Sequence, residues 1–200
     1  MHQMSFRKQF LIGLLPLLAT GCFPETETWL SDAATAKPDQ RLIGTFIGGD
    51  SNRERHLVVT EAAGSGSGAA FRLVWVGVKS KDEKKPVVWA AYRAWPARLA
   101  DGLTLLNLER IGRGRHATDV PDRFFARYDV GADGSVTIRM PRIPSWSRAV
   151  SSGALAGHVV KKKYIDRVTL KASRDSLIRY IKANAKVLFD ETGTEWRKIQ

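Results

Sequence analysis

The feature that most constrains this chain is a series of short runs rich in β-branched and aromatic residues, each ended by a turn signal. Such a series is typical of antiparallel sandwiches and barrels, whose strands are joined by short polar turns. The runs expected to form strands are Leu42–Ile47, Arg55–Glu61, Ala70–Val78, Val87–Trp95, Leu103–Glu109, Arg123–Val130, Ser135–Met140 and Tyr164–Lys171. Because about eight strands can close a small barrel, we predict a mainly β fold, an antiparallel β-barrel or sandwich with a C-terminal amphipathic helix.

Local signals define several elements more sharply. Asp133-Gly134 predicts a hairpin between Arg123–Val130 and Ser135–Met140, since glycine accepts a positive φ. A short helix is expected over Ser145–Ser152, and the longer helix over Ser173–Lys186 carries one apolar stripe. Trp196–Ile199 is expected to add a final short strand.

Two of the expected strands, Phe71–Val78 and Val87–Trp95, are apolar on both faces. This pattern indicates either central strands covered on each side or strands with one face lining an apolar pocket. Aromatic side chains on strands are most often plain core. If Trp75 and Trp89 line a cavity instead, they provide an apolar wall for a ligand.

The first 22 residues carry an export signal. Arg7-Lys8 is followed by the ten-residue apolar run Phe10–Ala19, which is the order of a secretory signal peptide. A membrane-spanning helix needs about 20 apolar residues, so this run is too short to be one. We therefore expect residues 1–21 to be a signal peptide that is cleaved.

The run ends in Leu18-Ala19-Thr20-Gly21-Cys22, which resembles the lipobox of bacterial lipoproteins. The resemblance implies that the Cys22 thiol receives a diacylglycerol and that cleavage makes Cys22 the new N-terminus. Phe23, in place of aspartate, implies an outer-membrane location facing the periplasm. Residues 22–40 are then expected to form a lipidated, polar tether, and 41–200 a single β-rich domain. The alternatives are an ordinary signal peptide with an incidental cysteine, or a core thiol on a buried helix.

The mature part of the chain is strongly basic. The formal net charge is +12, and the segment before Cys22 contributes only Arg7 and Lys8, so +10 remains. A positive field of this size attracts anionic lipid, acidic glycan, nucleic acid or an acidic envelope protein. An exported address disfavours nucleic acid among these partners. A single cysteine also leaves no internal disulfide to stabilise the domain.

The residues give little sign of catalysis or of a cofactor. After loss of His2, the remaining histidines, His56, His116 and His158, do not have metal-ligand spacing. His116 lies near Asp119 and Asp122, and a hydrolase with a nonlocal site around His116 is the alternative hypothesis. A solvated loop histidine is the simpler interpretation, and we expect no metal, no cofactor and no catalytic residue.

Two basic runs lie close to strand ends. Arg110–His116 includes Arg113 and Arg115, and Lys161–Lys163 includes Lys162. Arginines beside glycines can contact phosphate or carboxylate groups bidentately. Separately solvated loops are the alternative interpretation, but both runs would form a cationic rim if they lay at one end of a barrel.

The order of strands, a late helix and an edge strand resembles the layout of lipocalin-like barrels. Gly44-Thr-Phe46 stands where that family has Gly-x-Trp. Because layout alone does not fix function, we expect a noncatalytic binding or scaffolding module for an acidic or amphipathic ligand. Its proposed parts are Trp75, Trp89, Arg113, Arg115 and Lys162.

Overall fold

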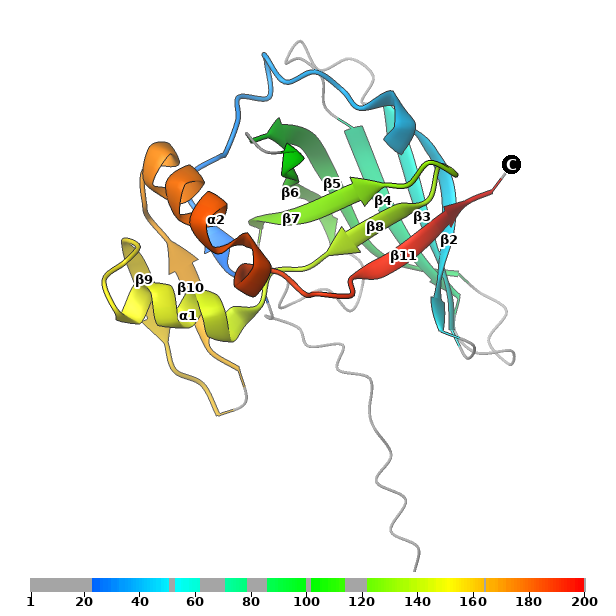
Figure 1. Ribbon diagram of the computed structural model, residues 1–200. Helices are drawn as coiled ribbons and strands as arrows, with labels where there is room; N and C mark the ends of the chain where they lie inside the picture. Colours follow the sequence, from blue (N-terminus) through cyan, green and yellow to red (C-terminus); the bar gives the residue numbers. More distant parts are fainter. Residues whose placement is uncertain are drawn as a thin grey trace, which may run out of the picture.

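The computed structural model (Figure 1) describes residues 23–50, 53–61, 71–78, 86–99, 102–113, 122–163 and 165–199. Eight strands close an antiparallel barrel in the order β11-β2-β3-β4-β5-β6-β7-β8, and β1, β10 and β9 form a small separate sheet. The elements are β1 (Glu25–Thr26), η1 (Gln40–Leu42), β2 (Gly44–Asp50), β3 (Arg53–Glu61), β4 (Phe71–Val78), β5 (Pro86–Arg98), β6 (Thr104–Arg113), β7 (Arg123–Val130), β8 (Val136–Arg139), α1 (Ile143–Ser151), β9 (Gly157–Val160), β10 (Arg167–Leu170), α2 (Arg174–Leu188) and β11 (Thr194–Lys198). The predicted mainly β fold with a C-terminal amphipathic helix is confirmed, and a barrel is the architecture formed. Within the described residues, no helix is long and apolar enough to cross a membrane.

The strand that completes the barrel differs from the one predicted. Tyr164–Lys171 was expected to be the eighth barrel strand, but β10 pairs with β1 and β9 in the small sheet. Instead β11 closes the barrel, with Trp196 opposite Gly48 of β2 and opposite Val136 of β8. The chain therefore leaves the barrel after β8, builds the flanking layer, and returns for its last strand.

The barrel interior is filled by side chains that alternate along each strand with outward-facing ones. Tyr128 and Phe124 of β7 are fully buried there. The predicted β7–β8 hairpin is present, with Gly134 at φ 80° in its turn. The buried interior residues are Leu42, Phe46, Leu57, Val59, Phe71, Leu73, Tyr92, Ala94, Leu106, Leu108, Phe124, Ala126, Tyr128, Val136, Ile138 and Trp196.

A second apolar core lies outside the barrel wall. Phe125 of β7 faces outward, and its ring lies 5.3 Å from that of Trp146 in α1. Leu177 and Ile181 of α2 are fully buried in the same core, as the predicted apolar stripe requires. The Trp146 Nε1 donates to the Leu188 carbonyl oxygen at 3.1 Å, so the one polar atom of this buried indole is paired.

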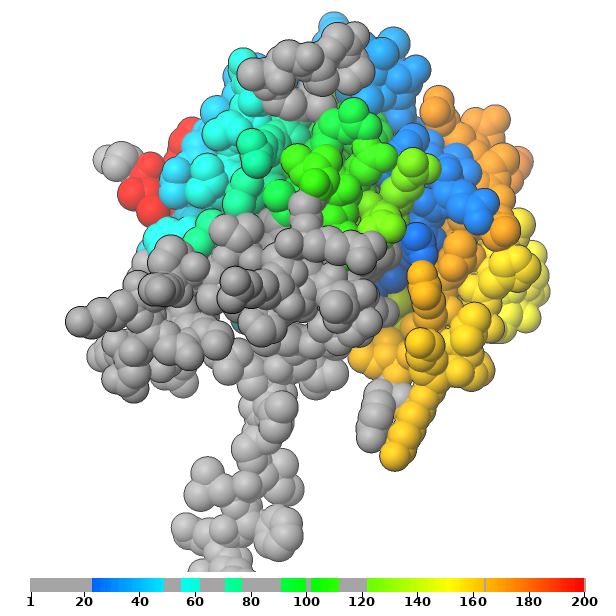
Figure 2. Space-filling model, turned by 180° about the vertical axis from the view of Figure 1, so that it is seen from behind, coloured from blue at the N-terminus to red at the C-terminus, as the bar shows by residue number. Residues whose placement is uncertain are grey.

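The segment predicted to be a polar tether is folded onto the protein. Leu30 is only 3% exposed, and its backbone N–H donates to the Asn107 Oδ1 at 3.0 Å. The Trp95 Nε1 donates to the Ser31 carbonyl oxygen at 3.1 Å. Figure 2 shows this N-terminal segment (blue) between the barrel and the flanking layer. The prediction was wrong for 23–40 because scattered apolar residues in a polar segment find partners on the outer face of β5 and β6.

One end of the barrel is closed by η1, which lies over the first residues of β2 (Figure 1). Leu42 of η1 is 3% exposed and belongs to the interior core. Asp39 precedes η1, and its Oδ1 accepts from the Arg41 backbone N–H at 3.3 Å. The Arg41 side chain donates to both Asp39 oxygens, at 2.8 and 2.7 Å, and the Tyr128 hydroxyl donates to Oδ2 at 3.3 Å.

Candidate ligand site at the open end of the barrel

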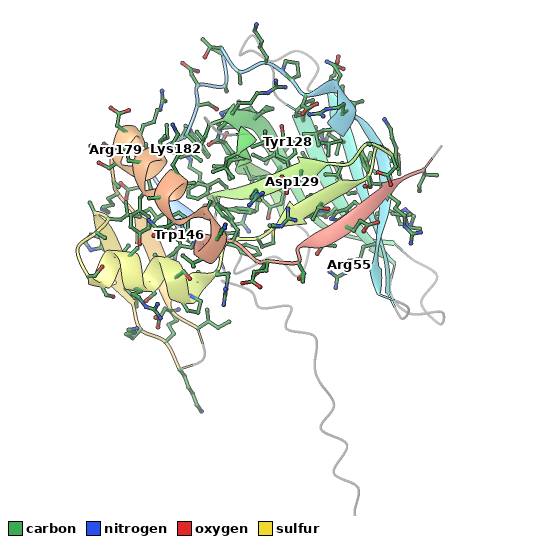
Figure 3. The ribbon with its side chains drawn as sticks, viewed as in Figure 1. Arg55, Tyr128, Asp129, Trp146, Arg179 and Lys182 are labelled. Atoms are coloured by element: carbon green, nitrogen blue, oxygen red, sulfur yellow. The ribbon has the colours of Figure 1, made fainter. Side chains whose placement is uncertain are left out.

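The end of the barrel opposite η1 is built differently. At this end β2 leads to β3, β4 to β5, and β6 to β7. Figure 3 shows Arg55 near this end and Tyr128 near the closed one. We call it the open end to distinguish it from the end that η1 covers; its connections between strands lie partly outside the described residues, and we define it by the interior-facing residues of the following paragraphs.

Two large side chains alternate with two glycines across neighbouring strands of the barrel. Arg55 faces the interior because it shares a strand face with the buried Leu57 and Val59. Its cross-strand neighbours are Gly48 of β2 and Gly77 of β4. Glycine on both sides leaves the space that an arginine needs inside a barrel wall.

The second large side chain is Trp196, which lies on the other side of Gly48. A Cβ atom added to Gly48 would lie 2.9 Å from the Trp196 ring and 2.8 Å from the Glu195 carbonyl oxygen. The indole therefore covers the glycine closely. The open end is thus shaped by an arginine and an indole packed around a residue that has no side chain.

Four aromatic rings form a continuous line that starts on β4, the strand next to Arg55. The Trp75 and Tyr92 ring centroids lie 5.5 Å apart, and those of Tyr92 and Phe124 are also 5.5 Å apart. Phe23 then stacks on Phe124 at 5.1 Å with an interplanar angle of 18°. We call Trp75, Tyr92, Phe124 and Phe23 the aromatic row. Trp75 and Phe23, at the two ends of the row, are half-buried, whereas Tyr92 and Phe124 between them are fully buried.

Three side-chain donors of the barrel interior are buried and have no acceptor among the described residues. They are the Trp75 Nε1, the Tyr92 hydroxyl and the Trp196 Nε1. Buried polar groups in native proteins are normally hydrogen-bonded, and leaving one unpaired costs about 1–3 kcal/mol. The indoles of Trp95 and Trp146, outside the barrel, are both paired. The Arg127 Nε, on the outer face of β7, is a further buried donor without an acceptor in the described part, and acceptors of a ligand could pair the three interior donors.

Positive charge lies beside these donors. Arg110 is the cross-strand neighbour of Tyr92, and its side chain is 6% exposed. Its Nε donates to the Asp122 Oδ1 at 3.1 Å, but the Asp122 side chain is 61% exposed, so water screens its charge more strongly. Burial raises the pKa of Tyr92 to about 12, and the Arg110 charge opposes that rise. Tyr92 therefore stays protonated and able to donate at neutral pH.

The structure brings only part of the predicted site together. Trp75 belongs to the aromatic row. Trp89 is the extra residue of a β-bulge in β5, since Trp75 is opposite Ala90 and Val76 is opposite Val88, and its side chain lies outside the described part. Bulges are common beside functional sites.

The basic residues predicted to form a rim are placed less completely. Arg113 is the last residue of β6, at the open end, and nothing is described of its side chain. Arg115 lies outside the described residues. Lys162 is exposed on the connection from β9 to β10, which belongs to the flanking layer rather than to the barrel wall. The cationic rim therefore stays a prediction.

The sequence interpretation did not assign four of the residues at the open end, namely Arg55, Tyr92, Arg110 and Trp196, to a site. Tyr92 was noted only as one of several strand aromatics, and Arg110 as part of a basic run. The signal that could have revealed Arg55 is its position two residues before Leu57 on the apolar face of an expected strand. Its glycine neighbours depend on strand register, which the sequence alone did not supply.

The structure describes no cluster of metal ligands and only one of the three residues named for a hydrolase site. Among the described residues, no three His, Cys, Asp or Glu side chains could hold a metal ion together. His116 and Asp119 lie outside that part, so the hydrolase hypothesis stays a prediction. Asp122, the other carboxylate named for it, forms an ion pair with Arg110.

Two surface hollows are lined by described residues, and both lie outside the barrel interior. One, of about 400 Å³, lies beside α2 and includes Arg127, Lys182 and Lys186 in its lining. The other, of about 430 Å³, lies where β8 ends and β11 begins, and Asp190 is part of its wall. Burial raises the pKa of Asp190, while Arg142 opposes the rise.

The chain was also compared with known proteins. No protein-family model matches it, and neither a curated protein nor a solved structure does so. Its function is therefore inferred from the residues at the open end.

Proposed function

We propose that this chain is a noncatalytic binding module, lipid-anchored in the bacterial envelope, which holds an acidic amphiphile at the open end of its barrel. The observation that carries the proposal is the group of three buried, unpaired donors beside Arg55 and Arg110. An acidic head group has oxygen atoms that accept from such donors, and an apolar tail can contact Phe23 and Trp75, the half-buried members of the aromatic row.

The arrangement favours binding over chemistry. Indole N–H groups and a tyrosine hydroxyl with a raised pKa donate hydrogen bonds but do not act as bases near neutral pH. Arginine keeps its proton at any physiological pH. These groups can recognise a phosphate or a carboxylate, and they supply no nucleophile.

The lipid anchor completes the proposal. A diacylglycerol on Cys22 and cleavage before it would hold the basic domain at the envelope membrane, with the outer membrane facing the periplasm as the expected location. In that compartment the available partners are anionic lipids, acidic glycans and other envelope proteins rather than nucleic acid.

The ligand class can be tested with two amphiphiles that share a tail. The purified full chain with Cys22→Ser, which carries no acyl groups, is titrated below the micelle threshold with dodecyl phosphate or dodecyl maltoside while tryptophan fluorescence is followed. We expect the phosphate to bind at least about tenfold more tightly, because a hydrogen bond to a charged group contributes about 1.5–3 kcal/mol. Equal binding of the two amphiphiles, or binding of neither, would contradict the proposal.

Two variants locate the site. Arg55→Gln should weaken the binding of dodecyl phosphate about tenfold and leave dodecyl maltoside unchanged, because it removes only charge. Trp75→Ala should weaken both, because it removes part of the aromatic row. The matched control is Arg148→Gln, which alters an exposed residue of α1 and should leave both affinities unchanged. An unchanged affinity in Arg55→Gln and in Trp75→Ala would place the site elsewhere.

The anchor has its own test. Cys22→Ser should move the chain from the membrane fraction to the soluble fraction of cells that export it. Membrane association that does not change would contradict the proposed lipidation.

A further inference from the structure

We infer that the open end of the barrel faces the membrane that carries the anchor, and that the β9–β10 hairpin makes a second, electrostatic contact with anionic lipid head groups. The inference rests on the proposed lipidation of Cys22. It adds an orientation, a second contact surface and a source for the ligand.

The first step is that the folded part of the chain begins directly after the proposed anchor, with no spacer between them. Phe23 already packs against the interior core, on Phe124 at the open end. Two residues later, β1 is hydrogen-bonded into the small sheet, and the Glu27 N–H donates to the Leu170 carbonyl oxygen at 3.1 Å. Consecutive Cα atoms are about 3.8 Å apart. An acylated residue bonded to Phe23 therefore keeps the open end within a few ångströms of the lipid head groups.

The second step places the hairpin on the same side. β1 runs parallel to β10, with Glu25 opposite Thr169 and Thr26 opposite Leu170. In a parallel pair, the residues before one strand lie at the same end as the residues before the other. The chain that precedes β1 therefore lies at the end of the sheet where β9 connects to β10. Figure 1 shows the hairpin projecting on the side of the molecule where β2 ends and β3 begins.

The third step is the chemistry of the hairpin. Val160 at the end of β9 is 54% exposed, which is high for a large apolar side chain. Lys161, Lys162 and Lys163 follow it, and the Lys161 side chain is 75% exposed while it pairs with Asp166 at 2.7 Å. An exposed apolar residue beside a basic run is typical of surfaces that bind anionic membranes. Figure 2 shows the hairpin as a protruding edge.

These steps together indicate where the ligand comes from. The aromatic row begins at Phe23, next to the proposed anchor, and ends at Trp75 inside the barrel. A membrane lipid whose tail contacts Phe23, the half-buried end of the row nearest the proposed anchor, then has its anionic head group close to the barrel. The bilayer, rather than the aqueous phase, supplies the ligand.

The orientation can be measured on the lipidated full chain, because its acylated Cys22 has no free thiol. Nitroxide labels are attached to Lys162→Cys or, as a control, to Gln40→Cys, which is exposed at the closed end. Both proteins are reconstituted into vesicles of phosphatidylcholine and phosphatidylglycerol. We expect the label at 162 to be at head-group depth and the label at 40 to be in water. Both labels in water, or the reverse order of depths, would overturn the inference.

The electrostatic contact has a separate test. The full chain with Cys22→Ser is mixed with vesicles that contain phosphatidylglycerol or only phosphatidylcholine. Lys162→Ala should weaken binding to the anionic vesicles about fivefold, the share of one lysine near such a surface. Lys182→Ala removes an exposed lysine of α2, far from the hairpin in Figure 3, and should change nothing. Equal losses in the two variants would contradict a contact specific to the hairpin.

The outcomes separate the inference from the proposed function. If dodecyl phosphate binds in solution and Cys22→Ser releases the chain, the proposed function stands whatever the labels report. In that case a label at 162 that lies in water overturns only the orientation. If Cys22→Ser leaves the chain on the membrane, the anchor itself is refuted, and the orientation falls with it.

Discussion

The two ends of the barrel differ in whether their buried polar groups are hydrogen-bonded. At the closed end, the carboxylate of Asp39 is 3% exposed and is paired with the Arg41 guanidinium, the Arg41 backbone and the Tyr128 hydroxyl. Toward the open end, the donors of Trp75 and Tyr92 have no acceptor among the described residues, and neither has that of Trp196, which lies between the two ends.

This difference indicates which polar groups contribute to the stability of the fold and which are available to bind a ligand. A fully paired polar group makes a barrel end more rigid, whereas an unpaired donor costs free energy unless something binds to it. We therefore expect substitutions at the closed end to reduce the free energy of unfolding. Substitutions that remove an unpaired donor should instead change ligand affinity and have little effect on stability, or even raise it.

The largest effect is expected for Asp39→Ala. The substitution removes the cap of η1 and leaves the Tyr128 hydroxyl and Arg41 without their acceptor. The free energy of unfolding should fall by about 3 kcal/mol, measured by urea denaturation. Asp32→Ala is the control, because Asp32 is an exposed carboxylate that also accepts from a backbone N–H two residues later. A loss in Asp39→Ala no greater than that in Asp32→Ala would remove the structural role of the closed end.

The second-largest effect is expected for Gly48→Ala, because the barrel has no space for the added methyl group. The new methyl group would meet the Trp196 ring and the Glu195 carbonyl oxygen at distances under 3 Å. We expect a loss of about 2 kcal/mol in the free energy of unfolding, together with weaker binding of dodecyl phosphate. The control is Ala94→Gly, which changes one methyl group at another buried position of the barrel interior. Gly134→Ala is unsuitable as a control, because Gly134 has a positive φ. A stable Gly48→Ala protein with unchanged binding would show that Trp196 does not define the site.

A matched pair of tyrosine substitutions compares the two ends directly. Tyr128→Phe removes a hydroxyl that donates to Asp39, so the free energy of unfolding should fall by about 1 kcal/mol. Tyr92→Phe removes an unpaired hydroxyl, so the same measurement should show no loss or a gain of up to about 1 kcal/mol. If Tyr92→Phe proved the more destabilising of the two, the contrast between the ends would be wrong.

The smallest effect is a pH dependence that belongs to the closed end. The hydrogen bond from the Arg41 side chain lowers the pKa of Asp39 below its ordinary value of 3.8, although burial opposes this. A carboxyl group with a lowered folded-state pKa stabilises the fold above its unfolded pKa, and this contribution is lost as the pH falls through the folded pKa. The difference in unfolding free energy between the wild type and Asp39→Asn should therefore be constant near neutral pH and shrink below about pH 4. A difference that grows on acidification would contradict a lowered pKa of Asp39 in the folded state.

Much of the barrel could be predicted because its signals are local. The alternation of Val136 and Ile138 and the turn at Asp133-Gly134 define β7 and β8 with no knowledge of the rest of the chain. The eighth strand could not be chosen in this way, because Arg167–Leu170 and Thr194–Lys198 have similar strand character. Only tertiary pairing decides between them.

The candidate site was harder to predict from the sequence, because it also depends on how the strands pair. Trp75 was found because its strand is apolar on both faces. Arg55 acquires its meaning only when register places Gly48 and Gly77 beside it. Phe23 was interpreted through the export signal, and its stacking on Phe124 depends on contacts about a hundred residues apart in the chain.

The most direct test of the account is native mass spectrometry of the protein purified from the membranes of the cells that express it. We predict one noncovalently bound anionic lipid per chain, which is absent from the variant that combines Arg55→Gln with Trp75→Ala. A wild-type protein that carries the diacylglycerol but no bound lipid, or a double variant that binds lipid as the wild type does, would contradict the claim that the open end is a ligand site.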